Sequence, residues 1–359
     1  MKIAPLKIAL VTDAWFPQVN GVVRTLAATV AELDRRGYEV ELITPQRFTT
    51  VPMPGYSQIR LALAPRFSAR RMLDAFVPDI VHIATEGPIG WSARSWCKAR
   101  GVPFTSAFHT RFPDYLAVRT GIDAEHFWPL MRRFHAPSRA VLVSTPTLAA
   151  ELEQRKLPRT ALWGRGIDHW TFRPDHEPHA ALKDLPRPIM LNVGRVASEK
   201  NLEAFLDADV PGTRVVVGDG PALESLRARY PGVVFTGSLS GEELAAAYCA
   251  ADCFVFPSLT DTFGLVLIEA LACGLPVAAF PVPGPLDIVG PEGRGADGDM
   301  PMTVASLDHD LAVAIRKALR LDRQGAAAFG ARFSWERATD QFVAALESAV
   351  AKRRELEAA

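Results

Sequence analysis

The sequence has few cysteines and no long apolar run, and both absences limit what the protein can be. Its four cysteines, Cys97, Cys249, Cys253 and Cys273, show no CxxC spacing, which disfavours a disulfide framework and a zinc site. No stretch reaches the roughly 18 to 20 uninterrupted apolar residues that a membrane-spanning helix needs. Residues 1–11 lack the basic start, apolar centre and small-residue cleavage site of a signal peptide. We therefore expect a cytosolic protein.

The sequence also lacks a dinucleotide-binding fingerprint. A strand-like run ends at Val217 and is followed by Gly218-Asp219-Gly220-Pro221. No third glycine is in place and the proline interrupts the pattern, so a nicotinamide-dependent dehydrogenase is disfavoured. Glycines at the carboxyl end of a parallel strand still let a ligand approach the backbone closely. Gly218 is therefore a candidate ligand-binding residue.

What is present is the composition of a folded, globular protein. The chain has 359 residues, of which 48% are apolar and 22% are charged, close to globular averages. This excludes a disordered chain, a collagen-like fibre and a coiled coil. The length is too great for one ordinary core and suits two domains of about 170 to 180 residues each.

A net charge of zero conceals two halves of opposite charge. Residues 1–170 hold 22 Lys and Arg against 14 Asp and Glu, whereas residues 171–359 hold 18 against 26. The basic half predicts an anionic partner such as a membrane surface, and residues 66–72 and 132–134 interleave basic with apolar side chains as membrane-docking segments do. For each segment alone, a solvated helix face explains the pattern better, and the summed charge imbalance is the stronger argument. Nucleic acid is disfavoured because the acidic half would repel it.

Short apolar runs alternate with amphipathic stretches along almost the whole chain. The runs rich in Val, Ile and Phe, which predict strands buried on both faces, are residues 7–12, 39–43, 80–83, 104–107, 141–144, 189–193, 214–217, 233–235, 253–256 and 277–279. The stretches between them predict helices, among them 22–36, 202–208, 241–251 and 265–273. This alternation predicts an α/β fold with two doubly wound parallel sheets, each wrapped by helices.

The predicted domain boundaries follow from composition. Residues 1–170 form a first Rossmann-like domain, and residues 188–334 form a second. Residues 171–187 hold three prolines and many charges, which is typical of a linker. Residues 335–359 predict a long helix that crosses back to the first domain. Two such domains face a central cleft, where ligands bind outside the carboxyl ends of the strands.

The second half contains a candidate diphosphate site. A buried strand ends at Gly194, Arg195 follows at once, and Lys200 comes five residues later. Both cations would project at a strand-to-helix junction, where backbone N–H groups already favour anions. A surface Arg and Lys near a turn are common, so this segment alone is a weak indication.

The segment from Phe256 to Ala270 is the most informative one. A strand ends at its start, the following loop carries Asp261, and Gly264 begins a helix that contains Glu269. An apolar helix face explains most of that helix, but it does not explain a carboxylate at 269, because a buried carboxylate needs partners. Two acids beside free helix-start N–H groups suit an elongated polar ligand. We therefore expect Asp261 and Glu269 to bind a ligand.

A divalent metal is not expected. Asp297-Gly298-Asp299 has the DxD form of metal-dependent transferases with a different fold, but it lies in the glycine-rich residues 290–301.

The acid spacing and several further segments resemble family 4 of the retaining nucleotide-sugar glycosyltransferases, which have the GT-B architecture. The resemblance covers nearly the whole chain, and Asp261 stands where most members carry Glu. The other segments that match are Thr12-Asp13-Ala14-Trp15-Phe16-Pro17-Gln18-Val19-Asn20-Gly21-Val22, Ala107-Phe108-His109-Thr110-Arg111, Trp163-Gly164-Arg165-Gly166-Ile167-Asp168 and Gly237-Ser238-Leu239-Ser240-Gly241-Glu242-Glu243-Leu244.

The resemblance implies a role for each matching residue in donor binding. It implies that Arg195 and Lys200 neutralise the diphosphate and that Glu269 binds the ribose. Asp261 would hold the sugar hydroxyls together with helix-start N–H groups. The residues that it places around the donor without a charged side chain are Gly21, Gly194, Gly218, Leu239, Phe263, Gly264 and Leu265.

His109 matches the family's active-site histidine, and the resemblance places it near the reacting side of the sugar. Together with Arg195, Lys200 and Asp261 it makes up the predicted catalytic set. Arg111 stands where many relatives have an acidic or amide residue, and it would face an anionic acceptor or an acidic donor sugar.

Two further residues are candidates for the acceptor. Trp15 would line the acceptor channel, although aromatic residues at such positions more often serve packing. Glu86 follows a predicted strand end and would touch the acceptor, although a surface position explains it equally.

The resemblance, together with the basic first half of the chain, implies a retaining hexosyltransferase. Its donor would be GDP-mannose, a UDP-hexose or a UDP-hexuronate, and its acceptor a hydroxyl of a membrane lipid or lipid-linked molecule. No cofactor is required, and the enzyme would be peripheral at the cytoplasmic face of the membrane. Two alternatives stay open, a nucleotide-sugar epimerase or hydrolase on the same fold and a non-catalytic sugar-nucleotide-binding protein.

Overall fold

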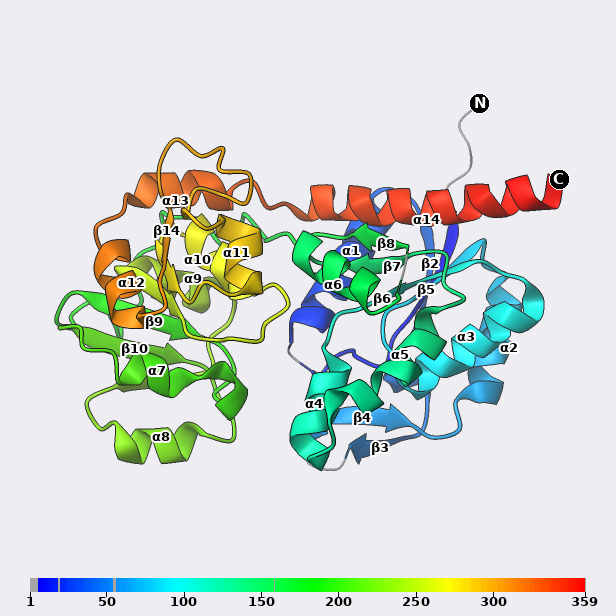
Figure 1. The fold of residues 1–359 in the computed structure, drawn as a ribbon, viewed down its shortest axis with the longest axis horizontal. Coiled ribbons are helices and arrows are strands. Elements are labelled where there is room, and N and C mark those ends of the chain that lie inside the picture. Colours follow the sequence, from blue (N-terminus) through cyan, green and yellow to red (C-terminus); the bar gives the residue numbers. More distant parts are fainter. Residues whose placement is uncertain (1–5, 19, 54–55, 158, 359) are drawn as a thin grey trace. The chain divides into compact units, whose positions relative to one another are not determined.

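The computed structural model describes residues 6–18, 20–53, 56–157 and 159–358. The chain forms two compact units (Figure 1). Unit 1 consists of Met1–Arg165 and Trp335–Ala359, and unit 2 consists of Gly166–Ser334. Each unit has its own six-stranded parallel sheet, as the alternation of apolar runs and helices predicts.

The sheet of unit 1 has the order β2-β1-β5-β6-β7-β8. Its strands are β1 (Lys7–Val11), β2 (Glu39–Ile43), β5 (Ile80–Ile83), β6 (Phe104–Ala107), β7 (Val141–Val143) and β8 (Thr160–Leu162). Every neighbouring pair is parallel, with Ile8 opposite Ile80 across β1 and β5. The central strands are buried on both faces, which explains why their sequences do not alternate.

Helices cover both faces of this sheet. They are α1 (Gly21–Arg35), α2 (Arg66–Phe76), α3 (Pro88–Arg100), α4 (Phe112–Thr120), α5 (Trp128–His135), α6 (Pro146–Gln154) and α14 (Trp335–Ala358). Local chemistry sets several starts: Asn20 accepts a hydrogen bond from the Val23 N–H at α1, and Thr145 does the same for α6. A separate antiparallel hairpin, β3 (Thr50–Met53) and β4 (Tyr56–Ala62), lies outside the sheet.

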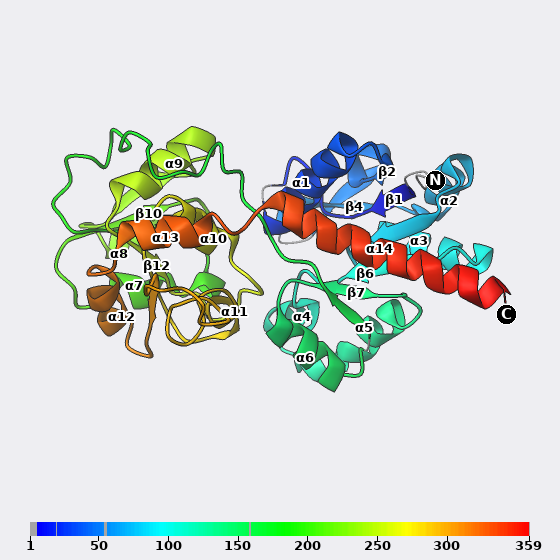
Figure 2. The same cartoon turned by 90° about the horizontal axis from the view of Figure 1, so that it is seen from above.

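The last helix, α14, is part of unit 1. It runs along the sheet beside α1 (Figure 2). Phe342 and Leu346 are fully buried in the same core as Ile8 and Leu10 of β1. Ion pairs from α1 flank this core, with Arg36 Nη1 2.6 Å from an Asp340 carboxylate oxygen.

The sheet of unit 2 has the order β11-β10-β9-β12-β13-β14, again with every pair parallel. Its strands are β9 (Ile189–Val193), β10 (Thr213–Val217), β11 (Val234–Gly237), β12 (Cys253–Phe256), β13 (Val277–Ala279) and β14 (Ala305–Leu307). Its helices are α7 (Leu202–Leu206), α8 (Leu223–Arg229), α9 (Gly241–Ala250), α10 (Leu265–Ala272), α11 (Pro283–Val289), α12 (Leu311–Ala318) and α13 (Arg323–Gly330).

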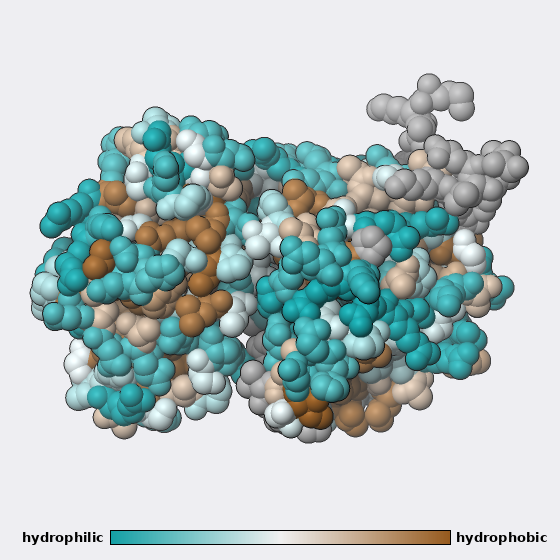
Figure 3. Space-filling model, in the orientation of Figure 1, coloured by the Kyte–Doolittle hydropathy of each residue, from teal (hydrophilic) through white to brown (hydrophobic). Residues whose placement is uncertain are grey.

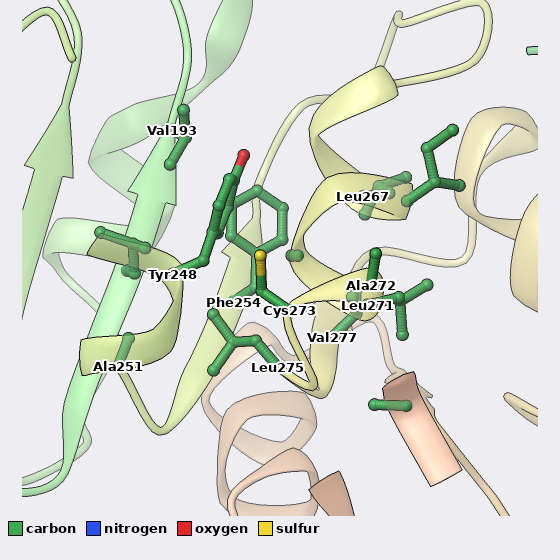
Figure 4. Close-up of a cluster of buried hydrophobic side chains, with 14 of the residues drawn as sticks. Val193, Tyr248, Ala251, Phe254, Leu267, Leu271, Ala272, Cys273, Leu275 and Val277 are labelled. Carbon is green, nitrogen blue, oxygen red and sulfur yellow. The ribbon is translucent and has the colours of Figure 1, made fainter. Parts of the chain in front are cut away.

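One core cluster of unit 2 lies between this sheet and helices that include α9 and α10 (Figure 4), and a second is formed with α7, α8 and α12. Tyr248 and Phe254 are fully buried in the first cluster, with ring centroids 5.8 Å apart. Each such side chain stabilises the fold by about 1.5–3 kcal/mol. Phe172 and Leu182 belong to the same core, so residues 171–187, which composition describes as a linker, lie within unit 2.

Among the helices that the structure describes, none combines the length and the apolar character needed to cross a bilayer.

Close helix packing in unit 2 requires a glycine at the end of α13. A Cβ at Gly330 would lie 2.2 Å from the Ala272 backbone nitrogen of α10. We expect Gly330→Ala to lower the free energy of unfolding by about 1–3 kcal/mol because the backbones must separate. This cost exceeds the helix propensity of Ala over Gly, at most about 1 kcal/mol. Thermal unfolding followed by circular dichroism measures it.

Gly232→Ala is the matched control, because no described atom lies within 4 Å of a Cβ added there. Equal melting temperatures for both variants would contradict the close approach of α13 to α10.

Candidate functional site

Unit 2 has a topological switch point between β9 and β12. From β9 the chain builds outward first through β10 and β11 and then, on the other side, through β12 to β14. Strands β9 and β12 pair only through Met190 with Cys253 and Leu191 with Phe254. Beyond these pairs, the Asn192 side-chain amide donates to the Val255 carbonyl at 3.0 Å. Open α/β sheets bind ligands outside the strand ends at such a point.

The loops that follow β9 and β10 are joined through their backbones. The Gly194 N–H donates to the Val217 carbonyl at 3.0 Å, and the Val196 N–H donates to the Asp219 carbonyl at 2.9 Å. A Cβ at Gly218 would lie 1.8 Å from the Gly194 carbonyl oxygen. Glycine at 218 is therefore needed for this backbone contact. It also leaves the end of β10 without a side chain.

Two predicted site residues from different loops form an ion pair at this point. Lys200 ends a 3-10 turn after β9, and its Nζ lies 2.6 Å from Oδ1 of Asp261, in the loop after β12. Asn201 fixes the two loops together by donating to the Pro257 carbonyl at 3.1 Å. The other oxygen of Asp261, Oδ2, is buried and accepts no hydrogen bond from the described residues. A cation and a carboxylate are thus held side by side at the sheet edge.

Helix α10 begins beside this ion pair. Gly264 precedes it with φ +95°, a conformation that L side chains rarely adopt. The first N–H groups of a helix have no acceptor within the helix, so they bind anions. The loop before α10 packs on α11, because a Cβ at Gly284 would lie 2.9 Å from the Asp261 carbonyl oxygen. Figure 3 shows apolar surface over α10 and α11.

Arg195 is the more exposed of the two predicted cations. Its side chain follows Gly194, and its Nη1 lies 3.5 Å from a Glu199 carboxylate oxygen. Leu239 follows strand β11 and is half-buried against the core of unit 2. Both residues are therefore at the same edge of the sheet as Lys200 and Asp261.

Glu269 is buried inside the second turn of α10. Its Oε2 accepts a hydrogen bond from the Tyr248 hydroxyl on α9 at 3.1 Å. Figure 4 shows the Tyr248 hydroxyl at the edge of the apolar cluster. Sequence reasoning identified the carboxylate as needing partners but did not find Tyr248. A tyrosine after the alanine run 245–247 of helix α9 is the signal that could have pointed to it.

In unit 1, Asp13 at the end of β1 is the residue that sequence reasoning left without a role. Its buried carboxylate accepts hydrogen bonds from the Ile89 N–H at 2.9 Å and the Gly90 N–H at 3.2 Å, both at the start of α3. Thr85 donates a further one. A Cβ at Gly87 would lie 2.3 Å from the Asp13 Cγ. Burial raises the pKa of Asp13 to about 6, against the effect of these donors.

The first loop contains two more predicted residues of unit 1. Gly21 is exposed at the first position of α1, directly after Asn20. Trp15 is half-buried and meets Phe16 edge to face at 5.5 Å. Val19 of the same loop lies outside the described residues.

His109 lies just beyond the end of β6, and Arg165 contacts it. The Arg165 Nη2 is 3.1 Å from Nδ1 of His109. Burial, Arg165 and His82 together hold the pKa of His109 well below its usual value. Sequence reasoning placed His109 in the site and Arg165 only in a matching segment. Nothing in the spacing, 56 residues apart, indicated the contact.

The two remaining predicted acceptor residues are engaged within unit 1. Glu86 has a mostly buried side chain, and its Oε1 lies 3.2 Å from Nε2 of His135. Arg111 forms ion pairs with Glu151 and, at 3.5 Å, with Asp114. An anionic acceptor at Arg111 would therefore compete with two carboxylates of the chain.

Asp299 of the DxD segment forms two hydrogen bonds with Arg332, at 2.9 and 2.5 Å. This pairing lowers the pKa of Asp299. Among the described residues, no group of three or more His, Cys, Asp or Glu side chains could hold a metal ion.

The chain matches two family models in succession. Residues 19–170 match the Glycosyltransferase Family 4 model, and residues 187–320 match the Glycosyl transferases group 1 model. The GDP-mannose-dependent alpha-mannosyltransferase of Mycolicibacterium smegmatis is 31% identical over 99% of this chain and 100% of its own length. The alpha-monoglucosyldiacylglycerol synthase of Streptococcus pneumoniae is 28% identical over 88% of this chain and 78% of its own length.

Solved structures show the same fold. The sucrose-phosphate synthase of Thermosynechococcus elongatus superposes with a TM-score of 0.67 at 24% identity, over 98% of each chain. Anabaena HepE in complex with UDP-glucose superposes with a TM-score of 0.69 at 15% identity, over 96% of this chain and all of the other. The fold, two Rossmann-like domains in one chain, is that of the GT-B glycosyltransferases. Within this class, the chain belongs to glycosyltransferase family 4.

The raised pKa of Asp13 predicts a specific pH dependence of stability. Its ordinary pKa is 3.8 and its folded-state pKa is about 6. Between these values the folded state binds more protons than the unfolded state, so the free energy of unfolding falls as the pH rises and levels off above pH 6. Two pKa units correspond to about 3 kcal/mol. Asp13→Asn removes this titration.

We therefore expect wild type to lose about 2–3 kcal/mol relative to Asp13→Asn between pH 4 and pH 7, measured by urea unfolding across that range. Asp34→Asn, at an exposed position of α1, controls for loss of a charge. Parallel pH curves for wild type and Asp13→Asn would show that this carboxyl titrates normally.

Proposed function

We propose that this glycosyltransferase is a retaining enzyme that moves a hexosyl group from a nucleotide diphosphate sugar to a hydroxyl of a membrane lipid or lipid-linked acceptor. The observation that carries the proposal is the Lys200–Asp261 pair beside the start of α10. The same sheet edge carries the exposed Arg195 and the glycines after two strands.

The diphosphate of the donor would lie across the ends of β9 and β12. Lys200 and Arg195 supply two positive charges, and the start of α10 supplies N–H donors. Gly194 and Gly218 present backbone without side chains, so phosphate oxygens can approach closely. Negative charge grows on the leaving diphosphate during transfer, and groups already in place there stabilise it without reorganisation.

The rest of the donor would be held by the two acids. Asp261, at the loop after β12, would accept hydrogen bonds from sugar hydroxyls once Lys200 turns to the phosphates. Glu269 would bind the ribose, with Tyr248 holding its carboxylate in place at 3.1 Å. Leu239 would support the base. Phe263 and Leu265, on either side of Gly264, would line the donor path.

The proposed reaction keeps the configuration at the anomeric carbon. The bond from that carbon to the phosphate oxygen breaks, and the acceptor oxygen forms its bond on the same face. The departing phosphate oxygen takes the acceptor proton, so the protein needs no carboxylate nucleophile. Lys200 and Arg195 would stabilise the phosphate, and the family resemblance assigns His109 to the reacting side of the sugar.

The donor is proposed to be GDP-mannose, a UDP-hexose or a UDP-hexuronate. The name of one relative supports GDP-mannose, and the name of another, a sulfoquinovosyl transferase of Arabidopsis thaliana, supports keeping other sugars open. Asp261 is one methylene shorter than the usual Glu of the family, which shortens its reach to the sugar.

Transfer of labelled sugar from GDP-mannose or UDP-hexoses to extracted membrane lipid tests the proposal. We expect a labelled glycolipid with the donor's anomeric configuration, and sugar release or epimerisation without acceptor would contradict transfer. Lys200→Ala removes a charged contact to the diphosphate, so donor affinity should fall roughly 10-fold to 100-fold.

Lys317→Ala is the matched control, because Lys317 also forms an ion pair, with Asp308 at 3.1 Å, at an exposed position of unit 2. Equal losses of donor affinity in the two variants would contradict a contact between Lys200 and the diphosphate.

The acceptor is proposed to reach unit 1 from an anionic membrane surface. Helix α2 exposes Phe67 almost completely, at 79%, and Val77 just beyond its end at 68%. Arg66 and Arg71 are exposed on the same helix, and Arg47 and Arg71 line a hollow beside Phe67. Apolar side chains among cations are typical of docking at an anionic bilayer. The enzyme would thus be peripheral, at the cytoplasmic face.

Phe67→Ser combined with Arg71→Gln should weaken binding to phosphatidylglycerol vesicles by roughly 10-fold or more, since each basic residue near the surface adds on the order of 1 kcal/mol. Vesicle co-sedimentation at low and high salt measures this. Leu162→Ser, at an apolar position of β8 that is also partly exposed, at 45%, and outside both predicted docking segments, should leave binding unchanged. Equal binding by all three proteins would place the membrane contact elsewhere.

A further inference from the structure

We propose that Arg165 is a positioning residue that fixes His109 as the neutral tautomer protonated on Nε2. His109 is then a hydrogen-bond donor to a substrate oxygen and not a general base. The tautomer follows from the contacts of unit 1 alone, whereas its catalytic consequence rests on the proposed function.

The argument begins with the hydrogen bond between the two side chains. The Arg165 Nη2 lies 3.1 Å from the His109 Nδ1. A guanidinium has only donors, so Nδ1 must be the acceptor and carries no proton. The proton of a neutral imidazole then resides on Nε2. A second proton on Nδ1 would bring two N–H groups against each other.

Arg165 is itself held in place, so it cannot easily turn away. Its Nη1 donates to the Trp163 carbonyl at 2.6 Å and to the Gly164 carbonyl at 3.0 Å. The guanidinium carbon lies 5.3 Å from the centroid of the Trp163 ring. One nitrogen of the guanidinium is thus bound to its own turn while the other reaches His109.

Helix α14 contacts the turn formed by Trp163 and Gly164. The Gln341 Oε1 accepts a hydrogen bond from the Gly164 N–H at 2.7 Å. Phe342 packs 4.8 Å from the ring of Trp163, centroid to centroid, and the fully buried Trp163 in turn lies 5.3 Å from the ring of His109. The orientation of His109 therefore depends on a helix that lies roughly 230 residues further along the sequence.

The charges around His109 agree with a neutral ring. The titratable groups that face it are Arg165 and His82 of β5, and each lowers the pKa of His109. His82 is fully buried, and burial lowers its own pKa to about 3. Imidazolium at position 109 is thus disfavoured throughout the physiological range.

A histidine fixed in this way can do one thing in the transfer. Its Nδ1 lone pair is occupied by Arg165, so the N–H group of the neutral ring is on Nε2, an atom that is buried in unit 1. That group can donate to a hydroxyl or phosphate oxygen without giving up its proton. The acceptor proton still leaves with the phosphate oxygen, and His109 orients the substrate during that step.

The first test measures the tautomer and needs no substrate. In protein labelled with 15N-histidine, long-range proton–nitrogen spectra distinguish the two neutral tautomers and the imidazolium. His109→Gln identifies the signal of His109. We expect an Nε2–H pattern that does not titrate between pH 5.5 and 8 in wild type. In Arg165→Met we expect a mixture of tautomers that titrates nearer the ordinary value, about 6.5.

An Nδ1–H pattern in wild type, or an unchanged pattern in Arg165→Met, would overturn the proposal. Arg165→Lys keeps a donor but cannot bind both the turn and the ring in the same way, so it should show an intermediate pattern. It also provides a second variant if Arg165→Met fails to fold, as judged by circular dichroism.

The second test is a double-mutant cycle in the transfer assay. We expect Arg165→Met to lower kcat roughly 10-fold to 100-fold with a smaller change in KM. Glutamine at 109 presents a fixed N–H and has no tautomer to select. Adding Arg165→Met to His109→Gln should therefore cost almost nothing further. A full additional loss would show that Arg165 acts by holding the fold.

The two tests fail separately. If no sugar transfer is found, the proposed function fails while the tautomer result stands. If transfer is found and the tautomer is Nδ1–H, the positioning role of Arg165 fails alone.

Discussion

The divergence of β9 and β12 is the constraint on which the candidate site of unit 2 depends. The two strands share only two residue pairs, and beyond them the Asn192 side chain takes the place of a backbone partner. Their loops must therefore leave the sheet in different directions and yet meet again through Asn201 and Pro257. Cations come from the loop after β9, and the carboxylate comes from the loop after β12. Neither strand alone could bring both charges to one edge. The site therefore depends on two parallel strands whose carboxyl ends lie at the same edge of the sheet.

Much of this arrangement could be predicted from the sequence, because it follows from periodicity and from glycines at strand ends. Residues 253–256 are all apolar, and residues 189–193 are apolar except for Asn192, as strands covered on both faces require. The structure confirms these runs as β12 and β9. The three-residue edge strands β8 and β14 and the hairpin of β3 and β4 were not among the expected runs. Short edge strands lack the continuous apolar run of central ones, and the hairpin sequence contains proline and polar residues.

Side-chain partners far apart in the chain could not be predicted in the same way. Glu269 was identified because a carboxylate is expensive to bury, but its partner Tyr248 follows only from the packing of α9 on α10. Glu86 and Arg111 are predicted to face an acceptor, and the structure adds a contact that the sequence did not indicate, with His135 for Glu86 and with Glu151 for Arg111. Sequence spacing indicates which strand end a residue follows. It does not indicate which neighbour the side chain turns towards, because that depends on the helices packed above.

Helix α14 has a consequence for the order in which the chain acquires its structure. The core of unit 1 includes Phe342 and Leu346, which are synthesised after all of unit 2. A ribosome producing this chain therefore makes every strand of the first sheet long before the helix that covers part of it exists. Domains generally fold as units during synthesis, so unit 2 has its complete sequence available earlier than unit 1 does. The amino-terminal unit is then the last to reach its final packing, and its uncovered apolar face is exposed for as long as the intervening residues take to be made.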